Sequence, residues 1–205
     1  MEKYSRFMMT ARVAAIAVAA SCAILAGSLA GAGSAHATGE IVDLMTPSDK
    51  ARLGQYETAR SKAFAGAASA GQSAEFDAIM SGMPVDVSAA DISGDWKCRT
   101  IKTGRFPEYV SYSWFRCRIS DDGSGWRLEK LTGSQRMSGR FFTDSDKRMI
   151  YLGTLHYADE KPSAYPRGDQ LDQVAYAVLL DDGRMRLEFP KPHLDSEFDV
   201  LELRR

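Results

Sequence analysis

The segment GDWKCRTIK at residues 94–102 decides the fold, because its hydrophobic and charged side chains alternate. Trp96 and Cys98 fall on one side of an extended chain, and Lys97 and Arg99 fall on the other. A period of two residues is typical of a β-strand with one buried face and one solvent-facing face. The segment 109–119 alternates in the same way. Together the two segments predict an antiparallel pair of two-sided strands.

Six more segments with strand character follow, separated by turns. Two Asp-Asp-Gly sequences, Asp121–Gly123 and Asp181–Gly183, are typical of type I′ or bulged hairpins, and 158–171 with its two prolines is expected to be a loop. The predicted strands are 94–102, 109–119, 125–132, 135–143, 148–157, 172–180, 184–190 and 197–204. Eight short strands joined mostly by hairpins favour an antiparallel up-and-down β-barrel over a sandwich. Such a barrel is either filled by side chains or holds one small ligand.

The last predicted strand breaks its own alternation. Phe198 and Val200 are in phase with each other, whereas Leu201 and Leu203 are out of phase with them. An extra residue in one strand produces such a change of phase, so we expect a β-bulge there.

The region 38–90 has a different amino-acid composition, which is rich in Ala, Ser, Asp and Glu. Thr46 followed by Pro47 is typical of a helix start, with Thr46 as the N-cap. Apolar residues then recur at helical spacing until Gly71; they are Leu53, Tyr56, Ala59, Ala63, Phe64 and Ala67. Ser73 is expected to cap a shorter helix whose stripe is Phe76, Ile79, Met80 and Met83. The sequence therefore predicts a mainly β (α+β) protein in which a helical hairpin packs on the barrel.

Residues 1–37 have the features of a cleavable signal peptide: basic residues, an Ala-rich apolar run, and Ala35 and Ala37 at the −3 and −1 positions of a cut. The alternative is an uncleaved membrane anchor, and Met8 or Met9 is an alternative start. We expect a signal peptide (1–37), a helical segment (38–90) and a barrel (91–205). The product would be periplasmic or secreted, with no stable membrane span after cleavage, because no second apolar run is long enough.

Cleavage would leave Cys98 and Cys117 as an even pair, which favours a disulfide in an oxidising compartment. If Cys98 lies opposite Cys117, then Trp96 lies opposite Ile119. Metal ligation is the alternative, but the chain has no Cys-x-x-Cys sequence. We expect no metal and no cofactor.

Composition and motifs exclude several function classes. Without residues 1–37 the chain keeps 23 basic and 26 acidic residues, which makes it a poor nucleic-acid binder. Nucleophile elbows, zinc-protease motifs, phosphate-binding Gly loops and dinucleotide fingerprints are all missing from the sequence, and no catalytic residue is assigned.

Positive charge is concentrated in 95–140, which holds ten basic and five acidic residues. One interpretation is a solvated outer barrel face. The other is an anion-binding patch, because Arg side chains suit carboxylate and phosphate groups. Aromatic side chains from the same region would line the barrel mouth. The candidate ligand-binding residues are Arg99, Arg116, Arg118, Arg136, Arg140, Tyr112 and Trp114.

Several short motifs carry a family resemblance. The segments 94–100, 115–119 and 131–136, with Tyr151-Leu152-Gly153 and Val200–Leu203, resemble an uncharacterised family of exported proteobacterial proteins, domain of unknown function 4893. This resemblance implies an envelope protein and no particular activity. Gly94-Asp95-Trp96 also resembles the Gly-x-Trp start of lipocalin-like calycin barrels, in which a late basic residue, here Arg204, packs on the Trp. No second lipocalin motif is found in the sequence, and lipocalin-like barrels lack the helical segment that precedes the barrel here.

These observations leave three hypotheses. The first is a non-enzymatic binding or accessory module for a small amphipathic or anionic ligand. The second is a protein-interaction module, such as a protease inhibitor or an envelope assembly factor. The third is a hydrolase, which would need His156 or His193 paired with a carboxylate or hydroxyl group. The partner is thus either an unknown small ligand or an envelope protein.

Overall fold

The computed structural model describes residues 38–106, 108–168 and 170–205, in which four helices precede nine strands. The predicted signal peptide lies outside the described residues. The helices are α1 (Thr38–Leu44), α2 (Pro47–Leu53), α3 (Tyr56–Ser69) and α4 (Ser73–Met80). The strands are β1 (Gly94–Thr103), β2 (Tyr109–Ser111), β3 (Phe115–Asp121), β4 (Trp126–Lys130), β5 (Gln135–Ser145), β6 (Arg148–Tyr157), β7 (Asp172–Leu179), β8 (Met185–Pro190) and β9 (Phe198–Arg204). None of the described helices has the length and apolar character needed to cross a bilayer.

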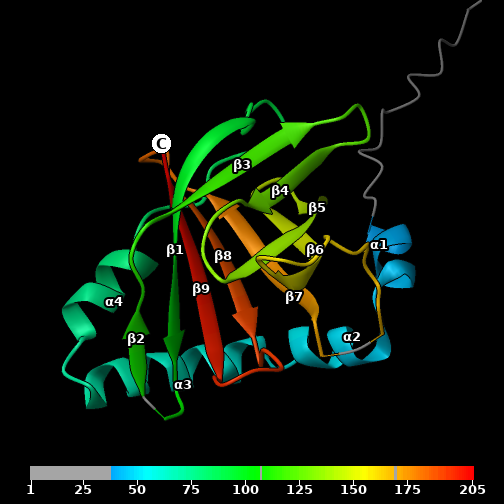
Figure 1. Ribbon diagram of the computed structural model, residues 1–205. Coiled ribbons are helices and arrows are strands. Elements are labelled where there is room, and N and C mark those ends of the chain that lie inside the picture. The colour runs from blue at the N-terminus through cyan, green and yellow to red at the C-terminus, as the bar shows by residue number, and fades with distance from the viewer. Residues whose placement is uncertain (1–37, 107, 169) are drawn as a thin grey trace, which may run out of the picture. The chain divides into compact units, whose positions relative to one another are not determined.

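The described strands form a closed antiparallel barrel (Figure 1). Strands β1 and β3 to β9 are neighbours in chain order, and β9 returns to pair with β1 from Lys97–Arg204 to Thr103–Phe198. This arrangement confirms the predicted up-and-down barrel of eight strands, and β2 is an addition to it.

The predicted strand 109–119 is in fact two strands on one edge of β1. β2 pairs with Ile101–Thr103, and β3 pairs with Gly94–Cys98. Because β3 leaves β1 beyond Cys98 and continues along β4, the remaining edge of β1 is free to pair with β2. The link between β2 and β3, residues 112–114, therefore lies beside the point where β3 diverges from β1.

The disulfide joins Cys98 to Cys117, but the predicted register was wrong by two residues. Cys98 lies opposite Phe115, and Cys117 lies opposite Trp96. The bridge runs diagonally between β1 and β3, with a Cα–Cα distance of 5.8 Å. Twist between neighbouring strands brings this diagonal pair within the 4.4–6.8 Å that disulfides span.

Inward-facing side chains fill most of the barrel. The cluster includes Trp96, Cys98, Cys117, Ile119, Leu128, Phe141, Met149, Tyr151, Met185, Leu187, Leu201 and Leu203. Gly139 and Gly153 are cross-strand partners, and a Cβ on Gly153 would lie 2.4 Å from the Tyr151 hydroxyl oxygen. Both glycines therefore give the Tyr151 ring room to lie against the barrel wall.

The helices cover two parts of the outer wall. α3 and α4 pack on β1 and β9 through Ile101, Phe198 and Val200. The α1–α2 region packs on β6 and β7, where Leu53 belongs to one cluster with Leu152. β9 is therefore buried on both faces, and its register with both neighbours is continuous. The predicted bulge was wrong, since the change of phase reflects two buried faces and no extra residue.

The helical segment differs from the predicted hairpin in its details. Thr46 does cap α2, and its Oγ1 accepts a hydrogen bond from the Asp49 N–H at 3.1 Å. The first helix is interrupted at Gly54, where α2 ends before α3 begins. Ser73 is the first residue of α4 rather than its cap. Met83 lies beyond α4 and is 70% exposed, so it is not part of the buried stripe.

Candidate functional site

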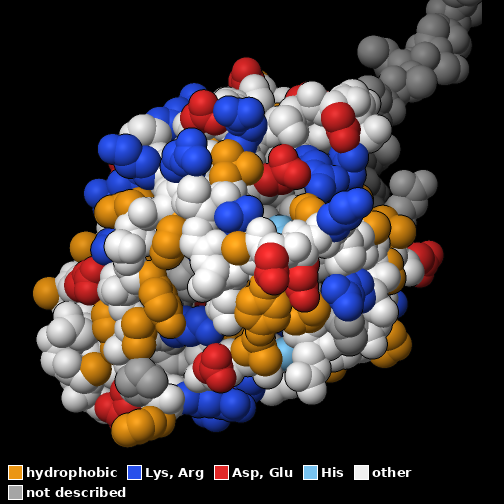
Figure 2. Space-filling model, in the orientation of Figure 1, with side chains coloured by type: hydrophobic (Ala, Val, Ile, Leu, Met, Phe, Trp, Pro, Cys, Tyr) orange, Lys and Arg blue, Asp and Glu red, His pale blue; other side chains and the backbone are white. Residues whose placement is uncertain are grey.

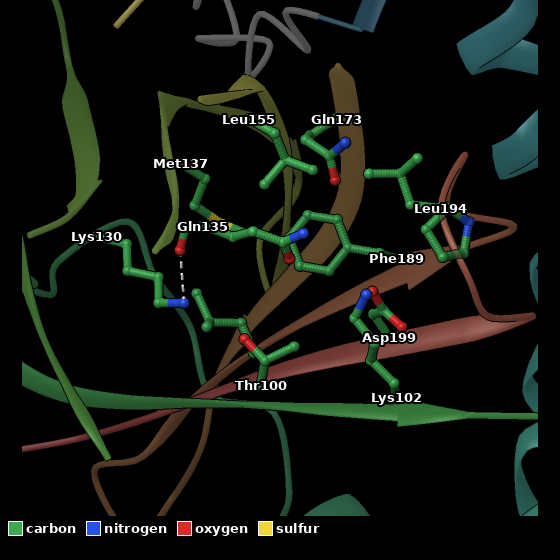
Figure 3. A pocket seen from close by; sticks show the side chains of 12 residues that line it. Thr100, Lys102, Lys130, Gln135, Met137, Leu155, Gln173, Phe189, Leu194 and Asp199 are labelled. Atoms are coloured by element: carbon green, nitrogen blue, oxygen red, sulfur yellow. Dashed lines mark hydrogen bonds between the residues drawn. The ribbon is translucent and has the colours of Figure 1, made fainter. Parts of the chain in front are cut away.

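A cavity with both polar and apolar walls interrupts the filling of the barrel at one end (Figure 3). Its volume is about 40 Å³, and a neighbouring hollow of about 80 Å³ shares Thr100, Lys102, Lys130 and Gln135 with it. We call the two together the mouth site. Its polar lining comes from Thr100, Lys102, Lys130, Ser134, Gln135, Gln173 and Asp199. Its apolar and aromatic lining comes from Met137, Leu155, Phe189, Pro192, Leu194, Leu201, Tyr112 and Phe115.

Strand alternation places the polar side chains of the mouth site inside the barrel. Thr100 and Lys102 continue the inward series that begins with Trp96 and Cys98 on β1. Asp199 precedes the inward-facing Leu201 on β9 and lies directly opposite Lys102. Because successive strands run in opposite directions, the end of one strand and the start of the next meet at the same rim.

Among the described residues, Lys130 is a buried cation without an anionic partner. It ends β4 and is 8% exposed. Its Nζ donates a hydrogen bond to the Gln135 carbonyl oxygen at 2.9 Å (Figure 3) and lies 4.2 Å from the centre of the Phe115 ring. No carboxylate of the described residues lies within 4 Å of this nitrogen. Burial, with a smaller contribution from the charge of Lys102, lowers the pKa of Lys130 to about 8.

Asp199 is the acidic group of the mouth site. Burial raises the pKa of its carboxyl group to about 7, against the opposing influence of the Lys102 charge. The Ser196 hydroxyl donates a hydrogen bond to Asp199 Oδ1 at 2.5 Å. The Lys102 ammonium forms its ion pair with the exposed Asp195 instead, at 3.7 Å. The site therefore combines two ammonium groups with a carboxyl group that is partly protonated near neutral pH.

Two amide side chains complete the polar lining. Gln173 is buried, and its Nε2 donates to the Asp172 carbonyl oxygen at 3.0 Å. Gln135 is only partly buried, and its backbone carbonyl already receives Lys130. Within residues 38–106, 108–168 and 170–205, no three His, Cys, Asp or Glu side chains gather as ligands for a metal ion.

Most of the residues proposed from the sequence face away from the mouth site. Arg118 pairs with Asp95 at 2.7 Å, and Arg140 pairs with Asp122 on the outer wall. Arg116 is exposed on the outer face of β3. Arg136 donates to the Gly133 carbonyl oxygen at 3.2 Å.

Arg99 and Trp114 are brought together outside the barrel. The Arg99 guanidinium lies 4.9 Å from the centre of the Trp114 ring and pairs with Glu75 and Glu202 at 2.9 and 2.7 Å. Of the proposed ligand-binding residues, Tyr112 is the one that also lines the mouth site.

The other residues of interest in the sequence lie elsewhere. Arg205 packs over Trp96 at 4.6 Å, whereas Arg204, the residue expected there, packs over Trp114 at 5.3 Å. His156 is buried on β6, burial lowers its pKa, and its Nδ1 has no hydrogen-bond partner among the described residues.

The mouth site was not found from the sequence, although a signal for it was present. Lys102 is in phase with Trp96 and Cys98, and Lys130 is in phase with Leu128. Asp199 is likewise in phase with Leu201. Charged side chains at the ends of an inward-facing apolar series indicate a polar cavity more directly than a regional excess of arginine does.

A family model described as "Domain of unknown function (DUF4893)" matches residues 43–203. No curated protein matches the chain, and no solved structure matches it.

Proposed function

The chain belongs to the DUF4893 family, and because that membership brings no activity with it, we propose from the mouth site that the protein is an exported module that binds a small amphipathic organic anion. The export part of the proposal is supported by the signal-peptide features of residues 1–37. The binding part is supported by the chemistry at the barrel rim.

The buried and unpaired ammonium group of Lys130 carries the proposal. A charge removed from water is costly unless an opposite charge compensates it. The nearest compensation for Lys130 is one carbonyl oxygen and one aromatic face, and a second cation, Lys102, lines the same hollow. An anion bound there would supply the missing charge and would stabilise both ammonium groups.

The remaining lining restricts the kind of anion. Met137, Leu155, Phe189 and Leu194 provide an apolar wall next to the two lysines. The two hollows of about 40 and 80 Å³ are far below the 300–1,000 Å³ of drug-sized pockets. A short carboxylate with a few carbon atoms fits this combination of charge, apolar surface and volume better than a bulky lipid or a nucleotide.

The test is a thermal-shift and calorimetric titration with butanoate and hexanoate. Butanol and butylamine serve as probes with the same apolar tail and no negative charge. We expect the carboxylates to raise the melting temperature and the alcohol and amine to leave it unchanged.

Lys130→Met removes the central charge and should abolish the carboxylate response, and Lys102→Gln should weaken it. Lys147→Met, which removes an exposed lysine from the β5–β6 turn, is the matched control and should respond like the native protein. Equal responses to butanoate and butanol, or an unchanged response in Lys130→Met, would overturn the proposal.

A further inference from the structure

Three basic residues form a row across neighbouring strands on the outer wall of the barrel. Lys97 on β1 lies opposite Arg116 on β3 and also opposite Arg204 on β9. All three side chains are exposed. Figure 2 shows Lys and Arg side chains gathered in this area, around the C-terminal end and the crossing of β1 and β3.

The positive charge of this row is not fully compensated by the described residues. Neither Lys97 nor Arg116 has a carboxylate within 4 Å among the described residues. Glu202 contacts Arg204 at 2.6 Å but is shared with Arg99. Like charges placed directly opposite each other on a sheet are destabilising, so the row weakens the fold unless an external anionic partner is present.

Other acidic groups near the row are already paired. Asp95 forms its ion pair with Arg118, and Glu75 forms one with Arg99. The face therefore keeps an excess of positive charge even though the whole chain has a formal net charge of −1.

Two exposed aromatic side chains come from the link between β2 and β3, and one of them, Trp114, contacts Arg204 of the row. Trp114 is 39% exposed and is held between Arg99 and Arg204, and Tyr112 is 44% exposed. Aromatic side chains with a polar atom are enriched where proteins meet the headgroup layer of a membrane, and basic residues are attracted to its anionic lipids.

We propose that this face, defined by Lys97, Arg116, Arg204, Trp114 and Tyr112 and called the basic–aromatic face, docks on an anionic lipid bilayer. A lipid surface suits the face because it offers many weakly held negative charges to a row of cations, and an interfacial layer to the aromatic rings. Tyr112 also lines the mouth site, so docking would place that opening beside the bilayer. The docking proposal does not depend on the proposed ligand.

The experiment is cosedimentation with vesicles, using protein expressed with residues 1–37, the predicted signal peptide, included. Vesicles of phosphatidylcholine alone are compared with vesicles that also contain phosphatidylglycerol, at low and at high salt. We expect binding to the anionic vesicles only, and weaker binding at high salt. Each basic residue near an anionic surface contributes about a fivefold gain in partitioning, so Lys97→Gln/Arg116→Gln should reduce it about 25-fold.

Controls separate docking from general charge and from ligand binding. Lys147→Gln/Lys161→Gln removes two exposed lysines elsewhere and should bind vesicles like the native protein. Trp114→Phe should remove the blue shift of tryptophan fluorescence that accompanies docking, whereas Lys130→Met should leave docking intact and affect only the carboxylate response.

Three results would overturn the proposal. The first is no binding to anionic vesicles at low salt. The second is an equal loss in the control variant. The third is that the protein binds polyglutamate through Lys97 and Arg116 but does not bind vesicles. This result would assign the face to an acidic protein partner.

Discussion

Replacing Asp199 by Asn should make the folded protein more stable at alkaline pH and leave its stability almost unchanged near pH 4. Burial raises the pKa of this carboxyl group from its ordinary value of 3.8 to about 7. As pH rises between these two values, the unfolded chain loses the proton while the folded chain keeps it. The folded state therefore loses stability through this interval, and the loss is complete above about pH 7.

The size of the effect follows from the shift. A difference of about three pKa units corresponds to about 4 kcal/mol, at 1.36 kcal/mol per unit. Because residue 199 as a whole is only partly buried, we expect an effect of about 2–4 kcal/mol. Asn preserves the shape and can still accept the hydrogen bond from Ser196, but it carries no charge.

Urea unfolding of both proteins at about pH 4 and about pH 8.5 measures the effect, since the difference between variant and native protein cancels the other titrating groups. Asp195→Asn is the matched control, because it removes an exposed carboxylate from the adjoining loop and should show no comparable pH-dependent gain. The same gain at both pH values, or a loss of stability at pH 8.5, would refute the reasoning. A further consequence is tighter carboxylate binding by Asp199→Asn at alkaline pH, because a negative charge is removed from the mouth site.

Three other changes test the remaining energetics. Lys130→Met should stabilise the protein by about 3 kcal/mol below about pH 8, where the folded and the unfolded native protein both carry the Lys130 charge. This gain should vanish as pH rises towards 10.5, and urea unfolding at several pH values measures it. Replacing Cys98 and Cys117 together by Ala should cost about 3 kcal/mol, because the bridge closes a loop of about 20 residues; thermal unfolding with and without reductant checks this. Gly153→Ala should cost about 3 kcal/mol or more, because the added Cβ would lie 2.4 Å from the Tyr151 hydroxyl; the chemical denaturation midpoint would reveal it.

The strands were predictable because alternation and turn chemistry are local properties. β6 has the predicted bounds, 148–157, and the other barrel strands that follow Asp121 differ from prediction by only a few residues at their ends. The division of 109–119 into β2 and β3 was not predictable. It depends on β3 leaving β1 to follow β4, and pairing between distant segments is not encoded in a short window.

The register of the disulfide and the expected bulge in β9 show the same limit of prediction from local sequence. Alternation correctly assigned Lys97 and Arg99 to the face opposite Cys98, but the disulfide was given the wrong register. Likewise, Leu201 and Phe198 were both expected to be buried, and a bulge was the simplest explanation if only one face of β9 was covered. The helices that cover the outer face made the bulge unnecessary.

The sequence by itself determined the period of two, the turns, the cap at Thr46 and the cysteine pair, because each of these rests on a few neighbouring residues or on counting. Only the tertiary structure decided which charges share a cavity. Lys102, Lys130 and Asp199 come from three strands and meet because the barrel closes between β1 and β9. Closure and twist set which strand ends lie across the rim from each other, and that geometry makes two inward-facing lysines, and not the outward-facing arginines, the basic lining of the cavity.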